Sequence, residues 1–481
     1  MPELGRRHRL LVLVICCSSL FVVSMDSTIV NLALPSIQAD LSASVTSLQW
    51  TIDAYTLTLA SLLMLAGSTA DRVGRKRIFR IGLVLFGVGS LLCSVAPSAG
   101  ALVGFRVVQA LGGAMLNPVA MSIIVNVFTD PRERARAIGA WGSVVGLSMA
   151  LGPLIGGALV DAVGWRSVFW INVPVVVAAV VATTRFVPES RAPRPRRLDP
   201  VGQVLMAVLL GGATFAIIEG PAQGWTSPAV LGCAVAAAAA LATLLPWERN
   251  RPEPLLDPRF FRSVPFAGAT VIAVCAFASL AGFLFVNALY LQSARGYSPL
   301  HAGLLTLPMA AMAAVLPTVA GRLVATRGAR IPLVVGGAGL VLSGAVLLTL
   351  RTDSPLWVLI TAYVLFGIAF GMVNPPITNT AVSGMPAAQA GVASAVASTS
   401  RQVGTALGVA IIGSAVTASV VGPLPTGLAA ATHVGWAVQI GCGIVVLVLG
   451  LVSTTAWARR TATHTAELFA ASDVPARAGV S

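Results

Sequence analysis

Long apolar segments recur from residue 10 almost to the end of the chain, separated by short loops. A helix needs about 17 to 25 mostly apolar residues to cross the hydrocarbon core of a bilayer. Because 56% of the 481 residues are hydrophobic and only 10% are charged, this chain cannot cover itself with a water-soluble surface. We therefore predict an all-α integral membrane protein. Its fourteen helices are predicted at 10–33, 48–69, 79–96, 100–127, 137–160, 168–187, 200–220, 228–246, 266–291, 301–324, 331–350, 356–380, 392–419 and 433–457.

The net charge of +14 comes from short basic clusters between apolar segments, not from one basic domain. Lys and Arg concentrate in the cytoplasmic loops of membrane proteins. With a cytoplasmic N-terminus, 26 of the 31 Lys and Arg residues fall on that side, and Arg166, Arg295 and Arg351 on the other. We expect both termini in the cytoplasm and no nucleic-acid partner. The arginine-rich, lysine-poor composition is typical of a GC-rich bacterial genome, so we expect the chain in a bacterial plasma membrane.

An internal repeat suggests two halves. Residues 67–76 read G-x3-D-x2-G-x-K after the second helix, and residues 321–330 read G-x3-A-x2-G-x-R after the tenth. Either these loops are equivalent in two six-helix halves, or two glycine-rich turns are similar by chance. On the first interpretation the domains are a six-helix bundle at 1–187, a linker with two inserted helices at 188–263, a second six-helix bundle at 264–457 and a cytoplasmic tail at 458–481.

The motifs of soluble enzymes and motors are absent from the sequence. The one lysine, Lys76, lies between two arginines, so there is no Gly-Lys-Ser/Thr loop for a nucleotide phosphate. No His or Cys cluster has metal-ligand spacing, and the six cysteines all lie in apolar segments. We expect no catalytic residue, metal or cofactor, since a membrane-embedded enzyme would need a convergent nucleophile or metal site.

Three charged residues lie inside the first, second and fourth predicted helices: Asp26, Asp53 and Arg106. A charge near the bilayer centre costs roughly 2.5 to 3.5 kcal/mol, so it normally faces a cavity or a partner. At about 1.5 Å per residue all three reach similar depths, so they could meet. Arg106 would favour an ionised carboxylate and desolvation a protonated one, as proton coupling requires. We prefer Asp26 as the titrating group; for Asp53 and Arg106 a fixed salt bridge is the alternative.

Small residues gather in the fifth predicted helix, where they permit close approach of another backbone. We interpret Gly146, Gly152, Pro153, Gly156 and Gly157 as a bent gate helix; an ordinary packing face is the alternative.

A substrate cavity is predicted from aromatic, amide and basic side chains inside other helices. Arg401 either faces this cavity or bonds backbone carbonyls, and Glu219 is expected to be hydrated at the outer end of the seventh helix. The predicted cavity residues are Trp50, Tyr55, Gln109, Asn117, Phe283, Asn287 and Arg401.

Several of these motifs resemble those of a known family. The 67–77 loop, Arg106-x2-Gln109 and Gly152-Pro153 resemble three signature motifs of the major facilitator superfamily. Residues 25–35, MDSTIVNLALP, and 165–174, WRSVFWINVP, look like signatures of its fourteen-helix drug:proton antiporter branch. Parts of the chain are also similar to methylenomycin-resistance type exporters.

The resemblance implies two bundles that rock around a central cavity. It places Asp26 and Arg106 in the proton-coupling region, and it assigns a cytoplasmic latch to the 67–77 loop. Ala325 departs from the motif because it replaces the acidic residue of the second loop, so a second latch should be weaker. The predicted latch residues are Gly67, Asp71, Arg72, Gly74 and Arg75.

The function that follows is proton-coupled efflux of a small amphipathic or cationic drug-like substrate by a monomer in the lipid bilayer. The alternative is a transporter of the same fold that carries a metabolite or nutrient. A passive channel is disfavoured because the loops lack a recognisable filter segment.

Overall fold

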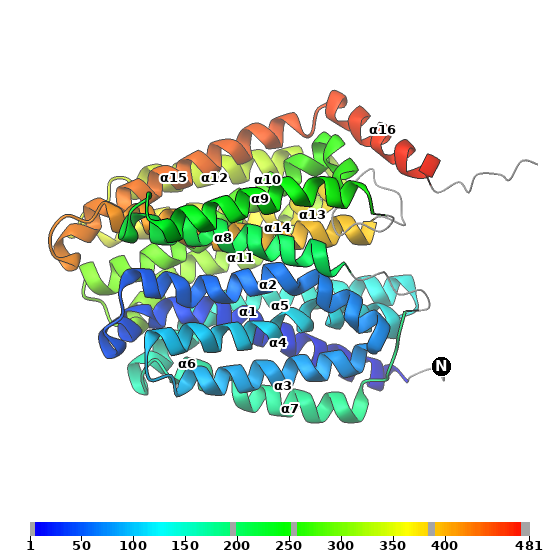
Figure 1. The fold of residues 1–481 in the computed structure, drawn as a ribbon, viewed down its shortest axis with the longest axis horizontal. Coiled ribbons are helices and arrows are strands. Elements are labelled where there is room, and N and C mark those ends of the chain that lie inside the picture. Colours follow the sequence, from blue (N-terminus) through cyan, green and yellow to red (C-terminus); the bar gives the residue numbers. More distant parts are fainter. Residues whose placement is uncertain (1–4, 193–198, 252–256, 383–389, 473–481) are drawn as a thin grey trace, which may run out of the picture.

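The computed structural model describes residues 5–192, 199–251, 257–382 and 390–472. Within these ranges the regular elements are all helices, and most lie side by side along the long axis of the molecule (Figure 1). In chain order they are α1 (Arg6–Leu41), α2 (Val45–Val73), α3 (Arg75–Ser94), α4 (Ala99–Val127), α5 (Pro131–Ala162), α6 (Ser167–Trp170), α7 (Asn172–Phe186), α8 (Pro200–Gln223), α9 (Pro228–Arg249), η1 (Pro258–Arg262), α10 (Val264–Leu289), η2 (Tyr290–Ala294), α11 (Pro299–Arg327), α12 (Arg330–Leu347), α13 (Leu356–Val382), α14 (Ala390–Ala418), α15 (Leu424–Val452) and α16 (Ala456–Ser472).

Thirteen helical segments of the described chain are long and apolar enough to cross a membrane, with α6 and α7 forming one of them. The remaining predicted segment, the thirteenth (392–419), corresponds to α14, which spans 29 residues but carries Arg401 and many Ser and Thr residues. It packs against α2, α10 and α15. The fourteen predicted segments therefore all have helical counterparts, in the predicted order.

Several helices extend beyond their apolar segments. The predicted end of the first helix at 33 is wrong, because α1 continues through Pro35 and ends where Ser42 adopts a left-handed conformation (φ 49°). The fifth helix begins six residues before the predicted 137, where the Asp130 carboxylate caps α5 by accepting hydrogen bonds from two backbone N–H groups. Helical hydrogen bonding continues into water, whereas an apolar segment ends at the hydrocarbon boundary.

The predicted tail from residue 458 contains most of α16. One face of this helix is buried through Ala458, Ala462 and Phe469. The Phe469 ring lies 4.9 Å from that of Phe260 in η1, and the Thr461 hydroxyl accepts a hydrogen bond from the Val264 N–H. The α16 helix is thereby fixed to the start of α10.

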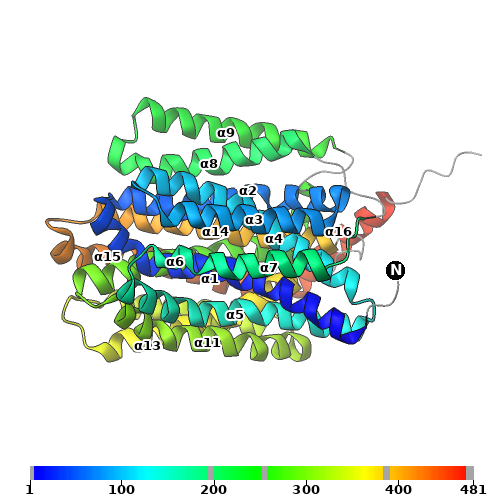
Figure 2. The ribbon, with the colours of Figure 1, turned by 90° about the horizontal axis from the view of Figure 1, so that it is seen from below.

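Helices α1–α7 lie on one side of the molecule in Figure 1, and α10, α12, α13, α14 and α15 lie on the other. Figure 2 shows α8 and α9 at one edge, beyond α2 and α14. Because α8 contacts both α2 and α14, the inserted pair covers the line along which these two helices meet.

The N-terminus and α16 lie at the same end of the molecule, which we call the terminal end (Figure 1). At the opposite end, the Gln49 amide donates to the Val409 carbonyl and the Ser414 hydroxyl, both at 3.1 Å. Gln292 donates to the Leu32 carbonyl at 2.9 Å.

The Asp161 carboxylate also accepts a hydrogen bond from the backbone N–H of Leu300, at 3.1 Å. Between described residues, the side-chain hydrogen bonds that join α1–α7 to α10–α15 all lie within about three turns of this opposite end. The two groups of helices are therefore held together there.

Candidate functional site

The polar centre of the N-terminal helices is assembled from α1, α3, α4 and α7. Asp26 lies in the middle of α1, Arg106 and Gln109 lie one turn apart on α4, and Asn172 begins α7. Close packing of α3 on α4 depends on Gly89, where an added Cβ would lie 2.7 Å from the Cβ of Gln109. Without that glycine, the α4 side chains could not approach α3 in this way.

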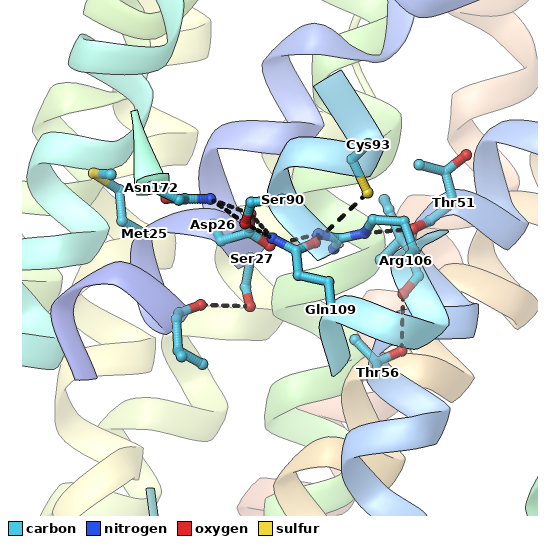
Figure 3. Close-up of polar contacts among 12 residues, drawn as sticks. Met25, Asp26, Ser27, Thr51, Thr56, Ser90, Cys93, Arg106, Gln109 and Asn172 are labelled. Atoms are coloured by element: carbon cyan, nitrogen blue, oxygen red, sulfur yellow. Dashed lines mark hydrogen bonds and ion pairs between the residues drawn. The ribbon is translucent and has the colours of Figure 1, made fainter. Parts of the chain in front are cut away.

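Asp26 and Arg106 form a buried ion pair. Their side chains are 0% and 1% exposed, and Arg106 Nη1 lies 2.5 Å from Asp26 Oδ2. The other carboxylate oxygen accepts hydrogen bonds from Gln109 at 2.8 Å and from Asn172 at 2.9 Å (Figure 3). Buried charges are stabilised only when their remaining hydrogen-bonding capacity is also satisfied. Both carboxylate oxygens of Asp26 therefore have partners, one a cation and the other two amide donors.

The guanidinium of Arg106 is held on its other sides as well. Its Nε donates to the Thr51 carbonyl at 3.1 Å, and its Nη1 also donates to Gln109 Oε1 at 2.6 Å. The Tyr55 ring lies 4.0 Å from the guanidinium carbon, a cation–π contact. Arg106 thus links α1, α2 and α4 through one side chain.

Asp53 is equally buried but lies outside this network. Its Oδ1 receives one long hydrogen bond, at 3.4 Å from the Thr56 hydroxyl, and its Oδ2 has no partner among the described residues. The three charges therefore do not all meet: only Asp26 and Arg106 do. Residues two apart on a helix do not share a face, so Tyr55 faces the guanidinium and Asp53 does not.

Two contacts of this network have no counterpart in the sequence predictions. Asn172 falls within the 165–174 motif without an assigned role, and Ser90 accepts a hydrogen bond from Gln109 at 2.8 Å. Their signal is a buried polar residue inside an apolar helix. Such signals are also common at ordinary packing positions, so the sequence does not select these two.

Trp50 and Glu219 lie together, away from the Asp26 network. The Trp50 indole donates to the Glu219 carboxylate at 2.8 Å, and its ring lies 6.0 Å from Phe215 on α8. Glu219, expected to be simply hydrated, also accepts from Gln223 at 2.8 Å. Trp50, predicted to line the cavity, instead joins α2 to the inserted helix α8.

The predicted latch residues surround the turn between α2 and α3. Arg75 pairs with Asp71 at 2.9 Å within the same turn, and Gly67 faces Pro118 on α4. Arg72 is exposed at the end of α2.

Gly74, the remaining latch residue, has φ 131°, a conformation that favours glycine. The Glu189 carboxylate, which no motif predicted, accepts hydrogen bonds from the backbone N–H groups of Lys76 and Arg77 at the start of α3. An acidic group there complements the helix dipole.

The predicted gate helix, α5, uses its small residues on two faces. Gly152 and Gly156 face Thr28 and Ile29 on α1. Gly146 faces Ala314 on α11, and Gly157 lies so near the start of α11 that an added Cβ would be 2.7 Å from the Leu300 Cα.

Pro153 completes this contact, because its carbonyl faces Gly303 on α11. The five predicted gate residues therefore place α5 directly between α1 and α11.

The predicted cavity residues of the C-terminal helices divide into two kinds. Phe283 lies in a packed aromatic cluster with Tyr363, Phe366 and Trp436, and the Tyr363 hydroxyl donates to Asn287. Phe283 and Asn287 thus lie in a packed core in this conformation.

Two other cavity predictions are half-buried. Asn117 on α4 has a carbonyl oxygen without a partner among the described residues. Arg401 on α14 donates to the Thr378 hydroxyl. These side chains retain unused hydrogen-bonding capacity.

A bundle of long apolar helices, with short connections and a satisfied ion pair buried in one half, defines a polytopic membrane transporter. The chain belongs to the Major Facilitator Superfamily, whose sequence profile matches residues 16–409. This membership indicates a transporter, not an enzyme.

Curated relatives cover most of the chain. It is 36% identical to the multidrug resistance protein Stp of Mycobacterium tuberculosis over 412 residues, which are 86% of this chain and 76% of the relative. It is also 36% identical to the methylenomycin A resistance protein of Streptomyces coelicolor, over 82% of each protein.

A solved structure supports the fold. A bacterial homologue of the human lysosomal transporter Spinster, in an inward-facing and unoccupied conformation, aligns with a TM-score of 0.66 at 20% identity. The alignment covers 96% of this chain and 99% of that one. At this identity the similarity establishes the fold alone.

Proposed function

We propose that this protein exports drug-like molecules from the bacterial cytoplasm across the plasma membrane in exchange for protons. The observation that carries the proposal is the contrast between two buried carboxyl groups, Asp26 in a charged network and Asp53 without a cation. The relatives add the substrate class, since Stp is named a multidrug resistance protein and another a methylenomycin A resistance protein.

The contrast suggests a way to couple proton transfer to a conformational change. An ionised Asp53 would be a buried charge without a counter-ion, which costs several kcal/mol, so this conformation favours its neutral form. Asp26 is stabilised as a carboxylate by Arg106, Gln109 and Asn172. If α2 and α4 shift relative to α1, Asp26 loses its counter-ion and its amide donors, and we propose that proton exchange takes place at this step.

The positions of the inter-bundle hydrogen bonds support an alternating-access cycle. We infer that the terminal end is cytoplasmic, because it carries the N-terminus and the sequence assigns 26 of the 31 Lys and Arg residues to the side of the N-terminus. The end held together by Gln49, Gln292 and Asp161 would then face outward, as in an inward-facing transporter. Rocking to the outward-facing state requires these three contacts to break.

The latch contributes to the same cycle. In the present conformation Arg75 is bound to Asp71 of its own turn, and Glu189 holds the start of α3. We propose that this turn engages the C-terminal half when the terminal end closes. Asp71 and Arg75 would then stabilise the outward-facing state.

A drug panel in a pump-deficient bacterial host tests the proposed function. Expression of this chain should raise the minimal inhibitory concentration of some compounds, and a protonophore should abolish the effect. Resistance that persists without a proton gradient would contradict proton exchange. Uptake, instead of efflux, of the same compounds would favour a nutrient transporter of this fold.

A further inference from the structure

The Arg401 side chain is a cation inside the bundle with few partners. Its Nη2 donates to the Thr378 hydroxyl at 2.5 Å, and its buried Nε has no partner among the described residues. No carboxylate or backbone carbonyl within the described ranges accepts a hydrogen bond from it, so the carbonyl-bonding alternative does not hold here. Arg106, by contrast, donates to the Asp26 carboxylate, the Gln109 side chain and the Thr51 carbonyl.

The surroundings of Arg401 fix its position between α10, α13 and α14. Three residues along α14, Gly404 packs on the α10 backbone, where an added Cβ would lie 2.9 Å from the Val274 Cα. The Phe277 ring, on the next turn of α10, lies 5.8 Å from the guanidinium carbon. The side chain is only partly buried, so its remaining donors can reach a ligand that enters the bundle.

A guanidinium carries five N–H donors in a planar fork that matches a carboxylate. Placing it among apolar helices with a single acceptor among the described residues is costly, because unsatisfied donors are expensive to bury. A bound anion would satisfy several donors at once through charge-assisted hydrogen bonds. Arg401 therefore has donor capacity that no acceptor within the described ranges uses.

The charges inside the described bundle favour the same ligand. Asp26 and Arg106 neutralise each other, and Asp53 has no cation and carries no charge when protonated. Arg401 has no carboxylate partner among the described residues, so its positive charge is left without a counter-ion. A cationic molecule would be repelled from this half, whereas an organic anion would be attracted.

We propose that Arg401 binds the carboxylate, or a similarly delocalised acidic group, of an amphipathic substrate, with the apolar body against Phe277 and the Thr378 hydroxyl as a second contact. That the bound molecule is a transported substrate rests on the proposed export function, but the anion site itself does not depend on proton coupling. The sequence predicts an amphipathic or cationic drug-like substrate; this inference selects an amphipathic anion instead.

Calorimetric titration of the purified full-length protein in a non-ionic detergent tests the site with two probes of equal shape. These are 2-naphthoate, which is anionic, and 2-naphthamide, which is neutral; protein-free micelles provide the blank. We expect naphthoate to bind at least about tenfold more tightly than naphthamide, as charge-assisted hydrogen bonds predict. Arg401→Ala should remove that preference and leave naphthamide binding unchanged.

Two further variants make the result specific. Arg401→Lys keeps the charge but loses the planar fork, so it should retain a reduced preference for naphthoate. Arg460→Ala removes an exposed cation from α16 and should bind both probes like the wild type. Arg401→Lys also decides the outcome if Arg401→Ala does not fold.

Equal binding of the two probes by the wild type, or undiminished naphthoate binding by Arg401→Ala, would overturn the anion site. So would complete loss of the preference in a folded Arg401→Lys variant. Because the titration uses no proton gradient, Arg401-dependent binding together with failed drug efflux would refute the export function alone. Efflux without Arg401-dependent binding would refute the anion site alone.

Discussion

Asp26 and Asp53 are carboxyl groups in the same half of the molecule, both fully buried, yet their polar environments differ. Asp26 has a guanidinium and two amide donors, whereas Asp53 has one hydroxyl at 3.4 Å. Substitution by Asn keeps the side-chain size and removes the negative charge. The two replacements therefore separate the effect of charge from that of packing.

The first prediction concerns transport. Asp26→Asn should abolish proton-driven efflux while the protein remains folded, because the Asn amide cannot take up and release a proton. The measurement is drug efflux from inverted vesicles energised by an imposed pH gradient. Unchanged efflux would exclude Asp26 from coupling, and Asn172→Asp serves as a comparison in which the network gains an acid.

The second prediction concerns stability. Asp26→Asn leaves the buried Arg106 charge without its carboxylate, a loss worth about 3–5 kcal/mol for a broken buried pair. Asp53→Asn removes no ion pair, so its effect should stay below about 1 kcal/mol. Thermal unfolding of the purified variants in detergent should show a clearly lower Tm for Asp26→Asn. An equal decrease in Tm for the two variants would mean that Asp53 is also paired in the folded protein.

At the scale of the helix, α5 is the element in which the residues singled out from sequence correspond most directly to close contacts in the structure. Its glycines and Pro153 lie where α1 and α11 approach most closely, so each position has an identified neighbour. The sequence predicts the density of small residues but not which helices they face. That assignment depends on the three-dimensional arrangement, since any apolar helix offers an equivalent surface.

The third prediction tests this element. Gly157→Val would force a side chain into the start of α11, because a Cβ added at Gly157 would lie 2.7 Å from the Leu300 Cα. Efflux should fall at least about tenfold, because the opposite end could no longer close. Gly142→Val is the matched control, since no atom beyond the backbone of its own helix lies within 4 Å of its added Cβ. Efflux retained by Gly157→Val would show that this contact is dispensable.

Some features of the helices follow from sequence and others do not. Apolar length predicts the number and order of the helices, because the bilayer imposes it. Counting residues from helix ends brings Asp26 near Arg106. The same counting ignores which face each residue occupies, so it wrongly groups Asp53 with them. Asn172 joins the site only because α7 packs beside α3 and α1, which no local pattern encodes.

For the whole molecule, the end opposite the termini is held by a small number of hydrogen bonds. Gln49 and Gln292 contribute amide donors from opposite groups of helices, and each donates to a backbone carbonyl across the interface. Each such bond contributes about 0.5–1.5 kcal/mol. Removing both should therefore shift a two-state equilibrium measurably without unfolding either bundle.

The fourth prediction measures that shift. In the double variant Gln49→Ala, Gln292→Ala, the population open at this end should rise about tenfold or more. Spin labels at the exposed positions Ser44 and Val421 would report it as a longer distance in pulsed electron resonance. Thr349→Ala, which removes only a local hydrogen bond, should leave the distribution unchanged. An unaltered distribution in the double variant would contradict the role of the two amides.

The inserted helix α8 contacts α2 and α14 together, and Trp50 binds it to α2 through Glu219. One flank of the molecule is thereby shielded from lipid, while α5 and α11 meet on the other without such a cover. A compound dissolved in the bilayer consequently encounters two unequal sides. An apolar substrate that enters from the inner leaflet would therefore have one lateral route into the bundle, beside the glycines of α5.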